Sequence, residues 1–421
     1  MSVFVFESYA FNEASGEASF RYSFDGQRQF TEVVQLRIGE GGYDREVFDK
    51  ALFLAFLLIG VSYYKTFPVK EARIASGVID EVQADFMNHV YQEGLGQFAY
   101  ENDLGRDDLV HFAPSSPDQK SHLPYSGNGL LSLQSGGKDS LLSAALLEDA
   151  GKTFTSFYVS SSDTHPAILD GVGEALVVVK RLIDRESLIK AAQEGGKSGH
   201  IPVTYIVLSI ALLQTILLNK KTVLASIGHE GEEPREWIGD LPVNHQWSKT
   251  WAAEQLFSDY VEKYVSADIQ IGSALRRYSE LRIGELFAEK AWAHYGHDFS
   301  SCNLANYMQG ADNTTLRWCG ECPKCANSFL LFAPFIEPNE LKSLFGGQDL
   351  FAKPLLAETF KGLLSIDGVA KPFECVGEID ELRYAYHSRK KGYEALPFVV
   401  PEASFDYKAE YPQQPWAATV L

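Results

Sequence analysis

Apolar and polar residues alternate near the start of the chain, which is the pattern of half-buried strands. Phe20, Tyr22 and Phe24 are separated by polar residues, so these aromatic side chains would share one face of a strand. Ser15-Gly16 and Asp25-Gly26 supply turns between such strands. The pattern predicts three strands, followed by two or three helices whose apolar residues recur at helical spacing. The strands are expected over Val3–Tyr9, Ala18–Asp25 and Phe30–Ile38, and the helices over Arg45–Tyr64 and Glu71–Tyr91.

In the middle of the chain, short apolar segments alternate with helical ones. Strands are predicted over Leu130–Leu133, Thr153–Val159, Leu176–Leu182 and Thr222–Ile227, and a long apolar helix over Pro202–Leu218. Such alternation indicates a parallel sheet, which binds its ligands at the carboxyl ends of the strands. We therefore expect Ser160–Asp163 and Ser226–Glu230, which follow two of these strands, to face one crevice.

The later segments are mostly helical by the same criteria. Helices are expected over Ala252–Tyr264, Tyr278–Tyr295, Cys325–Phe335, Glu340–Phe345, Glu358–Leu364 and Ile379–Arg389. His111–Asn128 is rich in Pro, Ser and Gly, as linkers are, and Gly392–Leu421 is expected to be irregular. The sequence thus predicts an α/β protein with a parallel-sheet domain over residues 126–330. A β-meander and helix region over residues 1–125 would precede it, and a mostly helical region over residues 331–421 would follow.

The segment after the Leu130–Leu133 strand reads Ser135-Gly136-Gly137-Lys138-Asp139-Ser140. Two glycines permit positive φ and let an anion approach the backbone closely. The N–H groups that follow, at the start of a helix, favour negative charge. Ser135 and Ser140 add hydroxyl donors and Lys138 adds a positive charge, whereas Asp139 beside a phosphate would need a bridging divalent cation.

This loop lacks the four-residue gap of the Walker loop. It resembles the PP-loop of the N-type ATP pyrophosphatases, which cleave ATP to AMP and pyrophosphate, and the resemblance implies that Ser135–Ser140 bind ATP. The alternative is a strand–turn–helix whose glycines serve only packing. Gly228, at the end of another predicted strand, would let the backbone approach the same nucleotide.

A second polar cluster spans Val243–Thr250, just before a predicted helix. Asn244, His245 and Lys249 lie close enough in sequence to form a substrate pocket. The alternative is a capped helix start with a half-exposed Trp247.

Four of the five cysteines lie between Cys302 and Cys325. Cys319, Cys322 and Cys325 are separated by two residues each, a spacing that brings thiolates onto one tetrahedral ion, with Cys302 as the fourth ligand. A structural zinc fits four sulfurs best; an iron–sulfur cluster and merely buried thiols are the alternatives. Cys375 stands alone and is interpreted as a core thiol.

Length, charge and cysteine usage limit the domain number, the partners and the compartment that the sequence allows. A chain of 421 residues suggests two or three domains. The net charge of −19 argues against a polyanionic partner such as tRNA, which needs a basic surface. Met1–Glu13 lacks the basic start of a signal peptide, and Ala51–Val61 and Ile206–Leu218 are too short to span a bilayer, so no membrane is expected. The clustered cysteines suggest a reduced compartment.

Two families combine such a loop with clustered cysteines. Leu130–Cys325 resembles the deazaguanine nitrile synthases of the queuosine pathway, which activate a carboxylate with ATP and bind zinc. The whole chain is more similar to the MurL family, the UDP-N-acetylmuramoyl-L-alanyl-L-glutamate epimerases. The shared features are Phe4, Phe6, Tyr9, Phe11, Phe20, Tyr22, Ser135–Ser140, Asn244–Lys249, Cys302 and Cys319–Cys325.

The resemblance to the epimerases implies a cytoplasmic enzyme that inverts the terminal L-glutamate of a UDP-linked muramoyl dipeptide. ATP would be cleaved to AMP and diphosphate in the presence of Mg²⁺. His245 and Lys249 are the first candidates for proton transfer, with His229 and Glu230 behind them. Lys138 would serve ATP, and the candidates for a second anion are Lys249, Arg181 and Lys324. A tRNA-modifying enzyme and a nucleotide-binding scaffold without turnover are the alternatives.

Overall fold

The structure is a computed structural model that describes residues 1–119, 123–308 and 314–420. Within these ranges nine strands form one mixed sheet, in the order β11-β8-β5-β6-β7-β3-β2-β1-β4. They are β1 (Val3–Asn12), β2 (Glu17–Phe24), β3 (Arg28–Gln35), β4 (Glu71–Ile74), β5 (Leu130–Leu133), β6 (Phe154–Ser160), β7 (Ala175–Leu182), β8 (Thr222–Ala225) and β11 (Gln270–Ser273). A separate two-stranded ribbon consists of β9 (Glu236–Ile238) and β10 (Leu241–Val243).

The strands β11, β8, β5, β6 and β7 are mutually parallel, as the sequence predicts for this region. In chain order, β6 and β7 are added to the sheet on one side of β5, and β8 and β11 are added on the other side of β5. The boundary between β5 and β8 is therefore a topological switch point, where open α/β sheets bind ligands beyond the strand carboxyl ends. The segment Ser135–Ser140 begins directly after β5 at this point.

The N-terminal meander continues the same sheet. β1, β2 and β3 pair in antiparallel fashion, and β3 pairs antiparallel with β7. At this junction Arg181 Nε lies 2.6 Å from Oε1 of the fully buried Glu32. The sequence predicts a parallel sheet beside a separate meander, whereas the structure joins the two through backbone hydrogen bonds into one mixed sheet.

Helices cover both faces of the sheet, so neighbouring residues of β5 pack in different hydrophobic cores. Leu131 belongs to a first core and Leu130 to a second. The first core includes α1 (Arg45–Ile59), α2 (Val61–Tyr64), α3 (Glu81–Tyr91), α4 (Gly96–Glu101), α7 (Val203–Leu217) and α8 (Trp251–Tyr264), with α6 (Arg185–Gln193) beside them. The second includes α5 (Lys138–Asp149), α9 (Glu280–Lys290) and α10 (Trp292–Tyr295). Of the helices in the described part of the chain, Arg45–Tyr64 alone is long and apolar enough to cross a membrane, and 83% of its apolar window is buried in the fold.

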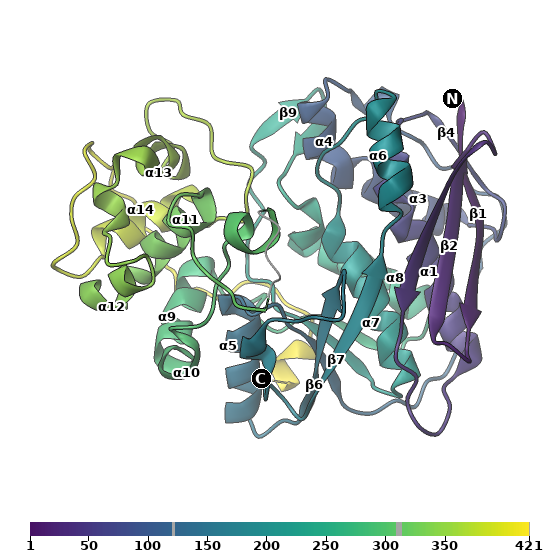
Figure 1. Ribbon diagram of the computed structural model, residues 1–421, viewed down its shortest axis with the longest axis horizontal. Helices are drawn as coiled ribbons and strands as arrows, with labels where there is room; N and C mark the ends of the chain where they lie inside the picture. Colours follow the sequence, from purple (N-terminus) through teal and green to yellow (C-terminus); the bar gives the residue numbers. More distant parts are fainter. Residues whose placement is uncertain (120–122, 309–313, 421) are drawn as a thin grey trace.

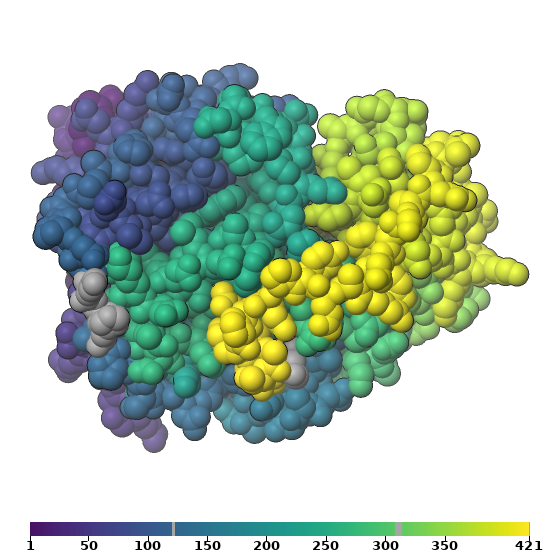
Figure 2. Space-filling model, turned by 180° about the vertical axis from the view of Figure 1, so that it is seen from behind, coloured from purple at the N-terminus to yellow at the C-terminus, as the bar shows by residue number. Residues whose placement is uncertain are grey.

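The second core extends into a helical region beside the parallel strands, as predicted (Figure 1). It contains α11 (Pro323–Phe332), α12 (Pro338–Ser343), α13 (Ala357–Leu363) and α14 (Ile379–His387). The C-terminal segment then crosses back over the middle of the chain, as the yellow atoms in Figure 2 show. Tyr411 stacks on His229 with ring centroids 3.6 Å apart, so this tail ties the helical region to a strand end of the sheet.

The structure differs from the sequence prediction in several elements: β9, β10, α4 and α6 are not predicted, and two further differences concern the sheet. Glu71–Ile74 is an edge strand rather than part of a helix, because it pairs in parallel with β1. The helix begins only at Glu81, where the Asp80 side chain accepts the Gln83 N–H. β11 is missed altogether, since a four-residue strand carries too short a pattern to stand out from the helices around it.

Candidate active site

The segment Ser135–Ser140 forms the predicted strand–turn–helix. Gly136 has a φ of +77°, and α5 begins at Lys138. Ser140 Oγ lies 3.2 Å from the Ser135 backbone nitrogen and donates to the Gly137 carbonyl, also at 3.2 Å, so it holds both sides of the turn. The first N–H groups of α5 have no acceptor inside the helix, which leaves them suited to an anion.

The Lys138 side chain ends in a buried ion pair. Its Nζ lies 2.7 Å from Glu280 Oε2 and also contacts Asp139. Burial lowers the pKa of Lys138, but the carboxylates of Asp139 and Glu280 outweigh burial and raise it above its usual value. Burial raises the pKa of Glu280 to about 7 despite the nearby ammonium. Lys138 thus anchors the start of α5 to the start of α9, and the predicted phosphate contact would require it to leave this pair.

A cavity of about 340 Å³ opens beside the loop, within the usual range of roughly 300–1,000 Å³ for small-molecule sites. Its lining includes Ser135, Gly137, Asp139 and Ser140 after β5, Ala225–Ile227 at the end of β8, and Val203, Thr204, Ser300 and Ser301. The cavity therefore lies at the switch point of the sheet. Among its described lining residues none comes from Ser160–Asp163, where Asp163 instead pairs with Lys180 near the surface.

Gly228, just beyond β8, is closely packed. A side chain there would meet Ile283 Cδ1 at 2.5 Å, and the Gly228 carbonyl accepts a 2.8 Å hydrogen bond from Arg276 Nη1. Arg276 is fully buried, donates from the same nitrogen to the Lys249 carbonyl, and pairs with Glu254. Arg276 therefore fixes the strand end relative to Lys249. A nucleotide contact by Gly228 stays a prediction.

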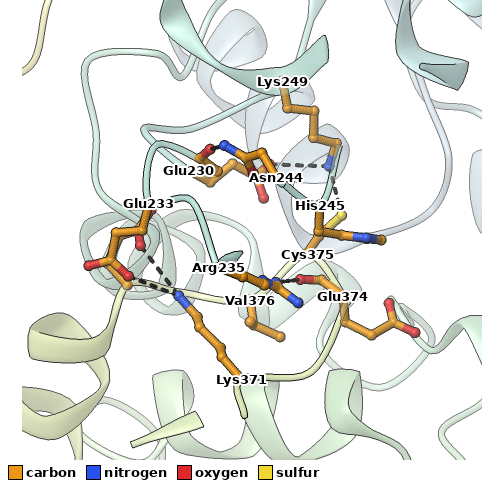
Figure 3. A pocket seen from close by; sticks show the side chains of 12 residues that line it. Glu230, Glu233, Arg235, Asn244, His245, Lys249, Lys371, Glu374, Cys375 and Val376 are labelled. Carbon is orange, nitrogen blue, oxygen red and sulfur yellow. Dashed lines mark hydrogen bonds and ion pairs between the residues drawn. The ribbon is translucent and has the colours of Figure 1, made fainter. Parts of the chain in front are cut away.

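Lys249 is a predicted site residue that does line the cavity. Its Nζ lies 3.2 Å from Glu230 Oε1 and 3.5 Å from Cys375 Sγ (Figure 3). Burial lowers the pKa of Lys249, but Cys375 and Glu230 raise it overall, so the ammonium keeps its charge. Burial raises the pKa of Glu230, but Lys249 and Lys324 bring it below its usual value, so the carboxylate stays ionised.

Behind Lys249 lies a polar chamber of about 10 Å³, drawn in Figure 3, which has room for about one water molecule. Lys371 Nζ lies 3.2 Å from Glu233 Oε2 and 3.3 Å from Glu378 Oε2. Burial and a hydrogen bond with Glu233 raise the pKa of Glu378 to about 8, so these two carboxyl groups share a proton near neutral pH. Charges of both signs are therefore fixed close to the cavity.

The two candidate histidines are absent from the described lining of the larger cavity. His245 lines the polar chamber, with Nδ1 2.6 Å from Gln97 Oε1 of α4. Burial and the neighbouring His200 and Arg235 lower the pKa of His245 to about 2. Burial and Arg276 lower the pKa of His229 to about 4. Both rings are therefore neutral near pH 7.

The four clustered cysteines converge as predicted. The Sγ atoms of Cys302, Cys319, Cys322 and Cys325 all lie within 4.8 Å of one another, and three of the pairs are 3.6 Å apart. A tetrahedral zinc with bonds of about 2.3 Å places its sulfurs roughly 3.8 Å apart. Three backbone N–H groups donate to these sulfurs at 3.3–3.4 Å, which favours thiolates. The cluster can hold a metal ion such as zinc.

The cysteine cluster also supports the cavity wall. The Ser300 N–H donates to the Gly136 carbonyl at 3.2 Å, and Ser300 Oγ accepts the Cys302 N–H at 3.1 Å. Lys324, within the cysteine run, lines the cavity and donates from Nζ to the Cys375 carbonyl at 2.6 Å. The glycine loop and the Cys375 loop are thus both tied to the cysteine-bearing segment.

Of the three basic residues predicted to bind a second anion, Lys249 and Lys324 line the cavity. Arg181 lies instead at the junction of β3 and β7, where Glu32 and Ser62 hold its side chain. Cys375, interpreted from sequence as a core thiol, is half-buried and lines the cavity. Sequence reasoning misses Glu280 and Arg276, because neither belongs to a local motif.

Together these features define an α/β protein with a cavity, the candidate ligand site, at the switch point of its parallel strands. The sequence matches the MurL N-terminal domain over residues 1–273 and the MurL C-terminal domain over residues 298–406. It is 35% identical to the UDP-N-acetyl-alpha-D-muramoyl-L-alanyl-L-glutamate epimerase of Xanthomonas oryzae pv. oryzae, over 91% of this chain and 85% of the relative. Proteins of the same name from Salinispora tropica and Micromonospora sp. are each 34% identical over 90% of this chain, and over 83% and 85% of their own lengths. The chain belongs to the MurL family.

Proposed function

We propose that this chain inverts the terminal L-glutamate of UDP-N-acetylmuramoyl-L-alanyl-L-glutamate, a step of peptidoglycan precursor synthesis, and that ATP activates the glutamate carboxylate. Membership of the MurL family and the names of its relatives support the substrate. The observation that carries the ATP-dependent step is the loop Ser135–Ser140, which borders the cavity at the switch point as a PP-loop would. The start of α5 suits phosphate, and Asp139, which lines the same cavity, is our candidate ligand for Mg²⁺ beside the phosphate.

Activation makes the glutamate Cα–H bond more acidic. In the free substrate the α-carboxylate opposes loss of the α-proton, because a second negative charge would form beside the first. Attack of a carboxylate oxygen on the α-phosphorus of ATP releases diphosphate and gives a neutral acyl group. The C–H electron pair can then move onto the acyl oxygen when a base takes the proton. Protonation of the opposite face inverts the centre, and hydrolysis releases AMP.

Lys249 and Lys324 supply positive charge at the cavity wall. In a chain of net charge −19, such local groups are needed to hold ATP and an anionic dipeptide together. We assign them to the substrate carboxylates and to the charge that develops on the acyl oxygen. The participation of His245 in proton transfer stays a prediction, since its neutral ring faces the smaller chamber.

The cysteine cluster is assigned to a structural zinc. Four sulfur ligands leave no open position, so the ion would supply folding energy rather than catalysis. Its contribution to function would be indirect, through the contacts of Ser300 and Lys324 with the cavity loops.

ATP turnover with two candidate substrates tests this proposal against RNA modification. AMP release is measured with the UDP-linked dipeptide and with tRNA, each across a series of salt concentrations. Stimulation by the dipeptide alone, with a shallow dependence on salt, supports the epimerase. Stimulation by tRNA with a steep salt dependence contradicts it, because many phosphate contacts release many counterions. Turnover that is indifferent to both also contradicts it.

A further inference from the structure

Among the described residues, Lys249 and Cys375 alone line both the larger cavity and the polar chamber. Cys375 Sγ lies 3.5 Å from Lys249 Nζ, and Lys324 Nζ bonds the Cys375 carbonyl at 2.6 Å (Figure 3 shows the thiol beside Lys249). A thiol that is not part of the cysteine cluster therefore lies at the cavity wall, next to one ammonium group and close to a second.

The loop that carries Cys375 is held on both sides of the thiol. Before it, Asn303 Nδ2 donates to Glu374 Oε2 at 2.8 Å. After it, the Gly377 N–H donates to Asn327 Oδ1 at 3.0 Å. Both asparagines come from the segment that also bears the clustered cysteines, so the position of the thiol is set by the same scaffold as the cavity wall.

We propose that Cys375 is a catalytic residue whose sulfur takes the α-proton from one face of the activated glutamate. This assignment rests on the proposed function. The Cα–H bond breaks, an S–H bond forms, and the C–H electron pair moves onto the acyl oxygen. A proton from water at the opposite face then makes the new Cα–H bond, and the thiol returns its proton to solvent. Lys249 stabilises the thiolate before the transfer and the acyl oxygen after it.

The groups that neighbour Cys375 are less suited to removing the α-proton. Lys249 keeps its proton, because Cys375 and Glu230 raise its pKa against the effect of burial. His245 already bonds Gln97 through Nδ1 and lines only the smaller chamber. Burial raises the pKa of Cys375 above its usual value, and Glu230 and Glu374 add to this rise, although Lys249 and Lys324 lower the pKa, so the thiolate forms mainly on the alkaline side. Since the thiolate is the active base, proton transfer should become faster as pH rises, while carboxylate activation should not follow the same profile.

The test separates carboxylate activation from proton transfer. Dipeptide-dependent exchange of labelled pyrophosphate into ATP measures activation, and deuterium incorporation at the glutamate Cα in D₂O measures proton transfer. Cys375→Ala should lower deuterium incorporation and D-glutamate formation by about 10²-fold or more, as loss of a general base does. Pyrophosphate exchange should stay near that of the unaltered enzyme. Cys375→Ser, a closer match in size, should show the same separation.

Val376→Ala is the matched control, because it shortens a buried neighbour in the same loop and keeps the thiol. A merely loosened loop should change exchange and proton transfer together. The assignment is overturned if Cys375→Ala still forms D-glutamate at the unaltered rate, or if it loses both readouts in parallel. If the unaltered enzyme shows no dipeptide-dependent exchange, the proposed function itself fails. If the unaltered enzyme shows exchange but Cys375→Ala gives either of the contradicting results, only the assignment of Cys375 fails.

Discussion

Lys138 Nζ and Glu280 Oε2 lie 2.7 Å apart, although 142 positions separate the two residues in the chain. The pair joins the helix that follows the glycine loop to α9, and both side chains are almost fully buried. Attraction within such a pair offsets only part of the cost of removing two charges from water. Burial accordingly raises the pKa of Glu280 to about 7, and the stability of the protein should depend on pH through this residue.

Glu280→Gln should remove that pH dependence. The carboxyl of Glu280 has a pKa of 4.5 when unperturbed and about 7 in the fold, so its contribution to stability is present below pH 4.5 and is lost as pH rises towards 7. Across this window the free energy of unfolding of the unaltered protein should fall relative to the variant by about 3 kcal/mol, at roughly 1.4 kcal/mol per pKa unit. Urea unfolding of both proteins between about pH 4.5 and 8 measures the difference. Parallel pH profiles would contradict the prediction.

Arg276→Met should destabilise the fold by about 3–5 kcal/mol, because it leaves the buried Glu254 without its partner and the carbonyls of Gly228 and Lys249 without a donor. Arg277→Met is the control, since the neighbouring arginine is partly exposed and pairs with Glu410, a contact worth about 1 kcal/mol or less. Denaturant unfolding compares the two. Equal losses would show that Arg276 has no special anchoring role.

Asp139→Asn should slow ATP cleavage while the protein stays folded. If Asp139 holds the cation beside the phosphates, the variant should lose about 2–4 kcal/mol of transition-state stabilisation, the usual cost of removing one such group. Asp149→Asn, at the far end of the same helix and paired with Lys290 near the surface, should leave cleavage unchanged. AMP and pyrophosphate release report the effect. Unimpaired release by Asp139→Asn would remove this residue from the ATP site.

Metal analysis of the purified protein should find one zinc per chain. Cys322→Ser should lose the metal, whereas Cys375→Ser should keep it, since only the first residue belongs to the cluster. Loss of the metal should also weaken pyrophosphate exchange, because Ser300 and Lys324 would lose their support. Iron with a visible absorption band would indicate an iron–sulfur cluster instead, and no metal at all would leave four clustered thiols.

Contiguous motifs explain what the sequence could predict. The residues of Ser135–Ser140 lie next to one another in the chain, so one strand and one helix suffice to build the turn. The run Cys319–Cys325 forms most of its own cluster in the same way, with Cys302 added from nearby. In both cases local backbone geometry decides which side chains meet.

The positions of the other site residues depend on tertiary contacts, which no local sequence pattern predicts. Glu280 meets Lys138 only because α5 and α9 pack on the same face of the sheet. Arg181 sits near a predicted strand end, yet pairing of β7 with the meander directs it to Glu32. Cys375 reaches the cavity through a loop of the helical region, and no spacing in the sequence relates it to Lys249.

The chirality of the product glutamate tests the central claim most directly. The purified protein is incubated with UDP-N-acetylmuramoyl-L-alanyl-L-glutamate and Mg²⁺, with and without ATP, and the glutamate released by acid hydrolysis is resolved into its enantiomers while AMP is measured. The account predicts D-glutamate only in the presence of ATP, accompanied by AMP. Glutamate that remains entirely in the L form, or inversion that proceeds equally well without ATP, would contradict it.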